Sequence, residues 1–149
     1  MTSDTQLDPT IESRVRASFA KQSMMRTLGA EIMTLGEGRC SIRSSIPPGA
    51  RQQQGFGHAG LTFSIGDSAA GYAALTCMGL DSEVVTSEIK INLLAPATGD
   101  YLLAEGRVIR PGRRLITVQS EVWAVTGDTR RQVAVLLGTM VPVPLTPPE

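Results

Sequence analysis

The sequence has 149 residues, the length of one domain built around one core. Apolar residues make up 42 % of it and charged residues 19 %, which is typical of a globular protein and not of a disordered chain. Fourteen basic residues balance 14 acidic ones and aromatic residues reach only 4 %, so neither a basic field nor stacking platforms favour a nucleic-acid or membrane partner. We therefore expect a single domain over residues 1–149 that binds neither.

The cysteines and the N-terminal segment predict the compartment. Cys40 and Cys77 lack the spacing of metal ligands, so we expect two free, buried thiols and neither a metal site nor a cofactor. The first 20 residues carry Asp4, Asp8 and Glu12 and contain no long apolar stretch, which argues against a secretory signal. These features predict a cytoplasmic protein.

The first third of the chain predicts a helix and a hairpin. Apolar residues recur at helical spacing over residues 10–28, with Thr10 as the N-cap and Gly29 as the C-cap. Residues 30–46 then alternate between apolar and polar side chains, and the alternation stops at a Pro-Pro-Gly turn, residues 47–49. We expect an N-terminal helix followed by two antiparallel strands.

The rest of the chain predicts a buried helix and then strands. A polar loop over residues 50–57 leads into residues 59–80, which are apolar or small on nearly every side, as in a helix buried all round. Three or four strands with antiparallel pairing are expected over residues 84–94, 101–110, 115–125 and 132–141. The tail, residues 142–149, carries four prolines and is expected to be loose.

This order of elements predicts an α+β fold, in which one long antiparallel sheet wraps around a central buried helix and an N-terminal helix precedes it. A single sheet covers one side of such a helix, so the remaining apolar surface needs another cover. A second copy of the chain would supply it, and pairing the two sheets edge to edge would also protect the exposed edge strands.

Chemistry is concentrated in residues 52–60 (QQQGFGHAG) and in Asp67. Asp67 is the sole charge between Arg51 and Asp81, and an ionised carboxylate is rarely buried without a partner or a task. Taken alone, Asp67 could satisfy backbone groups at an interface and His58 could be a structural residue at a helix start. Together they stand beside the free amides of a helix N-terminus, which can accept an oxyanion or a polarised carbonyl.

Helical geometry constrains how His58 and Asp67 can act. Nine residues correspond to about 900° of rotation and about 13 Å of rise, so the two side chains fall on opposite faces of one helix. They cannot share one site within one chain. If both are catalytic, Asp67 of one protomer acts beside His58 of another.

At these residues the chain resembles the hotdog-fold acyl-CoA thioesterases of the phenylacetic-acid-degradation (PaaI-like) type. In that family a loop motif N/Q-x-x-G-x-x-H-G-G opens the central helix, and an Asp or Glu follows nine residues after the His. Gln52, Gly55, His58, Gly60 and Asp67 match this register. The resemblance covers about residues 25–142 and continues through the segments VVTSEI at 84–89, INLLAP at 91–96, Gly-Asp at 99–100 and RPGR at 110–113.

The resemblance implies hydrolysis of an acyl-CoA thioester, with CoA as part of the substrate. Asp67 would be the nucleophile or the base that activates water, and the Ala59 amide would polarise the thioester carbonyl. His58 would brace the loop or contact the thioester, Gln52 would orient substrate or water, and Thr86 would position the water. Substrate-binding positions by the same match are Gly55, Gly60 and Asn92. The chain has Ala59 where the family usually has Gly, which would be strained at positive φ.

Arginines cluster around one predicted turn. Arg107, Arg110, Arg113 and Arg114 lie within eight residues, with Pro111 and Gly112 between them. The simplest interpretation is a solvated hairpin end. The functional interpretation is recognition of the CoA phosphates by forked guanidinium donors, with residues 110–114 as substrate-binding positions.

Three functions stay open at this point. The first is an acyl-CoA thioesterase, the second is a non-catalytic acyl-CoA-binding module, which Ala59 would permit, and the third is a hotdog dehydratase or hydratase. The expected assembly is a homodimer or a dimer-of-dimers tetramer with shared sites. The sequence leaves open the acyl group, the choice between base and nucleophile, and the number of copies.

Overall fold

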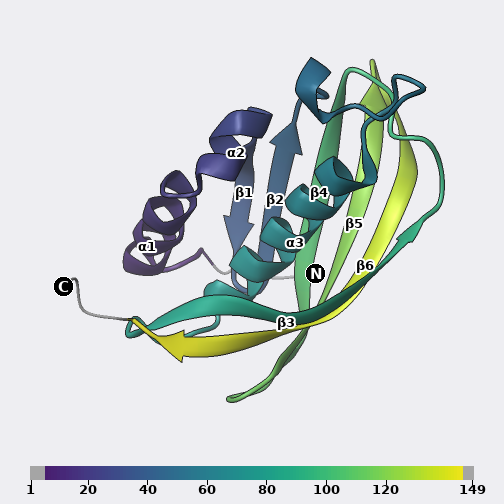
Figure 1. Cartoon of the computed structure of the whole chain (residues 1–149). Helices are drawn as coiled ribbons and strands as arrows, with labels where there is room; N and C mark the ends of the chain where they lie inside the picture. The colour runs from purple at the N-terminus through teal and green to yellow at the C-terminus, as the bar shows by residue number, and fades with distance from the viewer. Residues whose placement is uncertain (1–5, 146–149) are drawn as a thin grey trace.

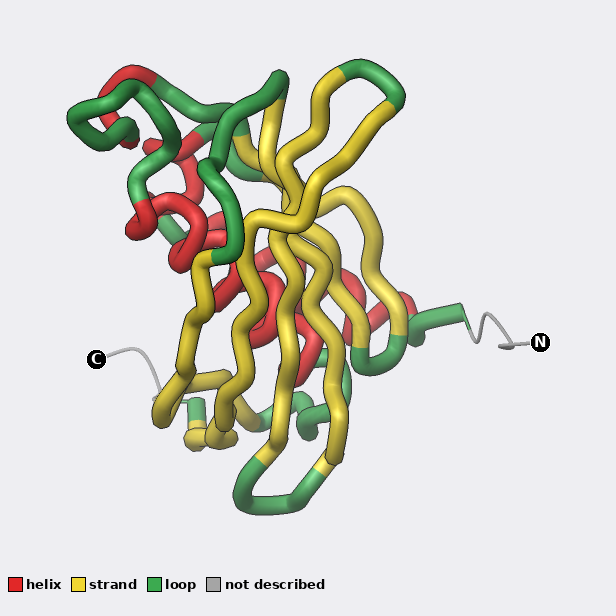
Figure 2. The backbone as a smooth tube through the Cα atoms, turned by 90° about the vertical axis from the view of Figure 1, so that its right-hand side faces the viewer, coloured by secondary structure: helices red, strands yellow, loops and turns green. Residues whose placement is uncertain are grey.

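A computed structural model describes residues 6–145 of the chain (Figure 1). Its strands form one antiparallel sheet in the order β1-β2-β4-β5-β6-β3. The strands are β1 (Glu31–Gly36), β2 (Arg39–Ser44), β3 (Ser82–Leu93), β4 (Tyr101–Pro111), β5 (Ile116–Thr126) and β6 (Thr129–Pro144). The sheet curves around one long helix, as Figure 2 shows from a second side with the strands in front of the helices. The α+β hotdog architecture predicted from the sequence is confirmed.

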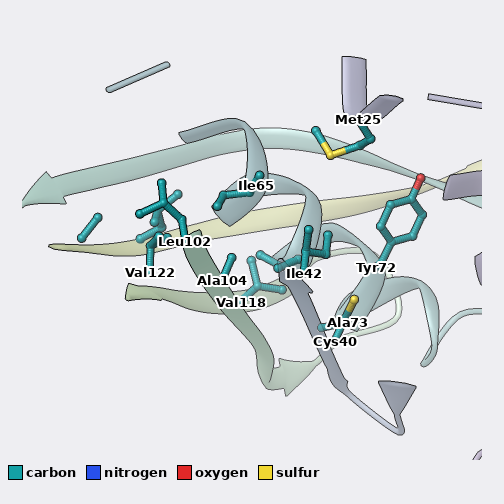
Figure 3. Close-up of a cluster of buried hydrophobic side chains, with 14 of the residues drawn as sticks. Met25, Cys40, Ile42, Ile65, Tyr72, Ala73, Leu102, Ala104, Val118 and Val122 are labelled. Atoms are coloured by element: carbon teal, nitrogen blue, oxygen red, sulfur yellow. The ribbon is translucent and has the colours of Figure 1, made fainter. Parts of the chain in front are cut away.

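The central helix, α3 (Ala59–Leu75), is buried along most of its surface. Twelve of its 17 residues are buried, and Figure 3 shows Ile65 and Ala73 in one cluster with Ile42, Leu102 and Val118 of the sheet. The other five residues form a single stripe of less buried positions: Ala59, Gly60, Phe63, Ser64 and Asp67. The helix is therefore covered on all sides but one by its own chain, by the sheet and by the α1–α2 segment, whose Phe19 packs on Tyr72.

The end of α3 differs from the prediction. The helix stops at Leu75 and not at residue 80. Thr76 accepts a hydrogen bond from the Gly38 amide (2.7 Å), and the Arg14 guanidinium binds the carbonyl groups of Met78 (3.3 Å) and Gly79 (2.6 Å). Arg14, which also donates to the Leu75 carbonyl (3.4 Å), satisfies carbonyl groups at and just after the helix end, and Thr76 ties this end to the β1–β2 turn, so the chain turns away there. No helix within residues 6–145 is long and apolar enough to cross a membrane.

The predicted N-terminal helix over residues 10–28 is two helices, α1 (Pro9–Ala20) and α2 (Ser23–Leu28). The break falls at Gln22, which is extended and whose side chain donates a hydrogen bond to Tyr72 Oη on α3 (2.7 Å). Asp8 and not Thr10 is the N-cap, because its carboxylate accepts from the Thr10 amide (2.7 Å). Gly29 ends α2 in the left-handed conformation (φ 65°), as predicted.

The predicted loose tail is partly a strand. β6 continues through Pro142 to Pro144, where it pairs with β3, while its pairing with β5 ends at Met140. Beyond Met140 a proline can stand in β6 because β3 is its sole neighbour there. Residues 146–149 of the tail lie outside the described residues.

The two cysteines have different surroundings. Cys40 is buried in the core, as predicted, and burial raises the pKa of its thiol to about 12. Cys77 is exposed, so the prediction of a buried thiol is wrong for this residue. Cys77 follows the last turn of α3, where the early end of the helix leaves it outside the core.

Candidate active site

The loop before α3 is fixed by its own backbone and by a contact with the β3–β4 connection. The Gln52 amide donates to the Phe56 carbonyl (2.9 Å), and Gly55 adopts φ 86° at the tip of the turn, where a side chain would be strained. The Gln52 side-chain oxygen accepts from the Gln54 amide. Gly57 donates to the Ala97 carbonyl (2.8 Å), which holds the loop against the β3–β4 connection directly before α3 begins.

His58 is the N-cap of α3. Its Nδ1 accepts a hydrogen bond from the Gly60 amide (2.8 Å), so the neutral ring carries its proton on Nε2. The Gly60 amide is thereby committed to His58. The Ala59 amide has no acceptor within residues 6–145, and it lies at the positive end of the helix. No residue other than glycine has a positive φ in that range, so Ala59 replaces the family's usual glycine without strain.

Asp67 is held by Thr86 of the neighbouring strand β3. Thr86 Oγ1 donates to Asp67 Oδ1 (2.7 Å), whereas Oδ2 has no hydrogen-bond partner in the described part of the chain. Burial raises the pKa of Asp67, and the hydrogen bond from Thr86 opposes that rise because it stabilises the charged form. Thr86 therefore fixes the orientation of the carboxylate through Oδ1, and Oδ2 is free to accept a proton or to contact a substrate.

The five predicted catalytic residues divide between two hollows, each of about 330 Å³. Asp67 and Thr86 line one, which we call the Asp67 hollow, and Gln52, His58 and Ala59 line the other, the His58 hollow. The two hollows have no lining residue in common. One chain therefore contains the two halves of the predicted site apart from each other, as the helical geometry required.

The predicted substrate-binding residues are dispersed. Gly55 and Gly60 belong to the loop and first turn described above, and Asn92 is an exposed residue of β3 that lines neither hollow. Residues 110–114, which we call the arginine turn, comprise the last two residues of β4 and the first part of its connection to β5, at the other end of the sheet from loop 52–58 (Figure 1). Arg107 does not join this turn, because its Nη2 donates to Gln119 on the outer face of the sheet (2.7 Å).

The structure adds side chains to the Asp67 hollow that sequence reasoning missed. Ser18 and Gln22 come from the junction of α1 and α2, Tyr72 from α3 and Glu83 from β3. Tyr72 follows Asp67 by five residues on one helix, and this spacing is a signal in the sequence that the two residues lie near each other. No signal in the sequence links Ser18 and Gln22 to Tyr72, because 54 and 50 residues separate them. Within residues 6–145 no group of three or more His, Cys, Asp or Glu side chains could hold a metal ion.

Comparison with known proteins decides the family. The family model of the thioesterase superfamily matches residues 54–130, which include both hollows' central residues His58 and Asp67. The chain belongs to the thioesterase superfamily. The predicted resemblance to hotdog-fold thioesterases of the PaaI-like type is confirmed by this match and by solved structures.

Three solved structures are similar to this thioesterase-superfamily chain in sequence and in fold. A thioesterase family protein from Silicibacter pomeroyi is 36 % identical, with 90 % of this chain and 98 % of that chain covered and a TM-score of 0.88. A conserved protein from Pseudomonas aeruginosa is 30 % identical over 82 % and 94 % of the two chains, with a TM-score of 0.74. The PaaI protein of the phenylacetic acid degradation operon of E. coli is 22 % identical over 92 % and 96 %, with a TM-score of 0.81, and shares the fold.

Proposed function

We propose that the protein hydrolyses acyl-CoA thioesters to a free acid and CoA, with Asp67 as the base or nucleophile. Membership of the thioesterase superfamily supports thioester hydrolysis in general. The observation that carries the proposal is the half-buried Asp67 carboxylate, with Oδ1 held by Thr86 and Oδ2 free. A carboxylate of raised pKa is a better proton acceptor than an exposed one, which suits general base catalysis.

Two routes lead to the same products. In the base route Asp67 takes a proton from a water molecule whose oxygen bonds to the thioester carbon. The carbon–sulfur bond then breaks, and the CoA thiolate leaves and takes up the proton. In the nucleophile route a carboxylate oxygen bonds to the thioester carbon, CoA leaves, and water hydrolyses the resulting anhydride. In both routes the Ala59 amide would donate to the carbonyl oxygen as its negative charge develops.

We further propose that each site is shared by two protomers of a homodimer, alone or paired into a tetramer. The division of the catalytic residues between two hollows supports this, because neither hollow holds both Asp67 and Ala59. β3 is a 12-residue edge strand with exposed Val85 and Leu93, an edge that pairing with a second copy would cover. Antiparallel pairing of two β3 strands would bring the Leu93 end and the nearby His58 hollow of one copy toward Thr86 of the other.

The arginine turn fits the same arrangement. Ile116, directly after the turn, pairs with Met140, which pairs with Thr86, so the turn and Thr86 lie at one end of the sheet. In the proposed dimer this end meets the partner's loop before α3. We propose that Arg110, Arg113 and Arg114 bind the CoA phosphates there, with forked donors that suit phosphate oxygens.

A panel of acyl-CoA esters of different chain length and ring content tests the proposed function. The expected result is release of CoA. The CoA is measured by chromatography and not with a thiol reagent, because the exposed thiol of Cys77 would also react with that reagent. The matched control is Asp67→Asn, for which we expect loss of at least about 10²-fold in kcat. Binding of the esters without release in the native protein would instead identify a non-catalytic acyl-CoA-binding module.

Asp67→Asn is a sound control because we expect it to fold at least as stably as the native protein. Burial raises the pKa of Asp67 above its value in the unfolded chain, so the ionised carboxylate lowers the free energy of unfolding at pH values above that pKa. Asparagine removes this charge and keeps the shape. A melting temperature equal to or above that of the native protein would show that lost activity is not lost structure.

A further inference from the structure

The far wall of the Asp67 hollow is polar. Gln22 Nε2 donates to Tyr72 Oη (2.7 Å), and Ser18 Oγ lies 3.4 Å from the same oxygen. Ser18 Oγ also donates to Glu83 Oε2 (3.1 Å). Four side chains from three separate segments thus form one hydrogen-bonded wall on the hollow that contains Asp67.

This wall offers both kinds of hydrogen-bonding group to a ligand. Tyr72 Oη accepts from Gln22, and because Ser18 donates its proton to Glu83, the acceptor for the Tyr72 proton is Ser18 Oγ at the long distance of 3.4 Å, which a ligand oxygen at normal hydrogen-bond distance can replace. The Glu83 carboxylate accepts from Ser18 and from the Val84 amide (2.9 Å) and keeps lone pairs for a further donor. A hydroxyl group, which donates one hydrogen bond and accepts others, complements this pair.

We propose that the Asp67 hollow receives the acyl group and selects acyl chains that end in a hydroxyl group, held by Glu83 and Tyr72. The inference rests on the proposed function, since it assigns the acyl part of that substrate. A volume of about 330 Å³ holds about ten non-hydrogen atoms at the roughly 30 Å³ that a water molecule occupies in the liquid. Tyr72 follows Asp67 by five residues on α3, about 7.5 Å of helical rise, so a six- or seven-carbon chain spans from Asp67 to the polar wall.

The same wall disfavours two other kinds of chain end. A methyl end would exclude water from Glu83 and Tyr72 without offering a hydrogen bond in its place, which leaves part of the hydrogen-bonding capacity of these two groups unmet. A carboxylate end would meet the negative charges of both Asp67 and Glu83. Two cations lie nearby. Lys21 lines the hollow but is exposed and forms no ion pair with Glu83 in the described part of the chain. Arg14 interacts with Glu83 through its charge, but its guanidinium is hydrogen-bonded to the Met78 and Gly79 carbonyls and does not line the hollow.

Three CoA esters of nearly equal length test the inference: 6-hydroxyhexanoyl-CoA, heptanoyl-CoA, in which a methyl replaces the hydroxyl, and adipoyl-CoA, which ends in a carboxylate. We expect kcat/KM to be about tenfold higher for the hydroxyl ester than for heptanoyl-CoA, the worth of one good hydrogen bond, and lowest for adipoyl-CoA. Equal values for the three esters, or a preference for adipoyl-CoA, would overturn the inference.

Two variants identify the wall as the source of the preference. Glu83→Gln removes one negative charge, so the ratio of adipoyl to heptanoyl turnover should rise by about tenfold. Tyr72→Phe removes the hydroxyl donor, so the ratio of hydroxyhexanoyl to heptanoyl turnover should fall. Because each readout is a ratio between two substrates, a partial loss of folded protein does not affect it. The matched control is Glu37→Gln in the exposed β1–β2 turn, which should leave both ratios unchanged.

The outcomes separate this inference from the proposed function. If all three esters are cleaved with equal kcat/KM, thioester hydrolysis stands and the assigned acyl class is wrong. If neither variant changes its ratio, the wall does not contact the chain end. If no CoA ester is cleaved, the proposed function fails and the inference fails with it.

Discussion

At the scale of single residues, Thr86 opposes the effect of burial on Asp67. Its hydroxyl hydrogen bond lowers the pKa that desolvation raises. In Thr86→Val the shape is kept and the bond is lost, so the pKa of Asp67 should rise further. Because catalysis needs the charged carboxylate, the acid limb of the kcat/KM profile should move to higher pH.

Thr86→Ser is the matched control for this pH shift. Serine keeps the hydroxyl group, so the acid limb should stay where it is in the native protein. An acid limb at the same pH in the valine variant would mean that Thr86 does not bias the Asp67 charge during turnover.

Ala59 can be tested through its amide alone. It is the first residue of α3, a position where proline is well accepted, and the preceding His58 already has the extended conformation that proline requires (φ −61°, ψ 146°). Ala59→Pro therefore deletes the free N–H and keeps the helix. If this amide stabilises the oxyanion, kcat should fall by about 10²–10³-fold.

Ala59→Gly is the control, since it keeps the amide and should retain most activity. Circular dichroism and the melting temperature would show whether the proline variant keeps α3. Native turnover by a folded Ala59→Pro protein would remove Ala59 from the mechanism.

At the scale of elements, α3 depends on one glycine of the sheet. A Cβ on Gly106 of β4 would lie 2.3 Å from the carbonyl carbon of Ala69 and 2.6 Å from the Ala70 nitrogen. Backbone atoms of a packed helix cannot rotate away, so Gly106→Ala should lower the free energy of unfolding by about 1–3 kcal/mol in urea titrations. Gly49→Ala meets no atom within 4 Å and should change it by less than about 0.5 kcal/mol.

The arginine turn is a second element with its own test. Arg110→Ala with Arg113→Ala should raise KM for CoA esters by about tenfold or more and leave KM unchanged for a pantetheine thioester, which lacks the nucleotide phosphates. Arg107→Ala is the control, because Arg107 is bonded to Gln119 away from the turn. Equal effects on both substrates would contradict phosphate binding.

Which elements the sequence predicts depends on how local their causes are. The buried helix, the strands and the Gly29 cap follow from periodicity and from glycine, so they were predictable. The break at Gln22 and the end of α3 at Leu75 were not. Gln22 turns toward Tyr72, and Arg14 binds carbonyl groups more than 60 residues away, so both boundaries depend on tertiary contacts.

The same distinction holds for the site. Spacing along one helix was enough to predict that His58 and Asp67 lie apart in one chain. The Thr86 position followed from a resemblance, and the structure supplies the hydrogen bond that gives it a reason. The polar wall of Ser18, Gln22 and Glu83 depends on how α1, α2 and β3 pack on α3, which no local pattern encodes.

At the scale of the whole molecule, the decisive question is whether two chains form one site. Each half-site can be inactivated separately, by Asp67→Asn in one hollow and Ala59→Pro in the other. Each variant alone should be inactive. In a mixed dimer, one site carries both defects and the other carries none, because the native Asp67 of one chain faces the native Ala59 of its partner.

Differently tagged copies of the two variants, refolded together and purified through both tags, give this mixed dimer. Its activity should be about half that of the native dimer, since one of two sites is intact. Two copies of Asp67→Asn with different tags are the control and should stay inactive. If each chain held a complete site, every site in the mixed dimer would carry one defect and no activity would return, so a lack of recovery in a purified mixed dimer would exclude the shared site.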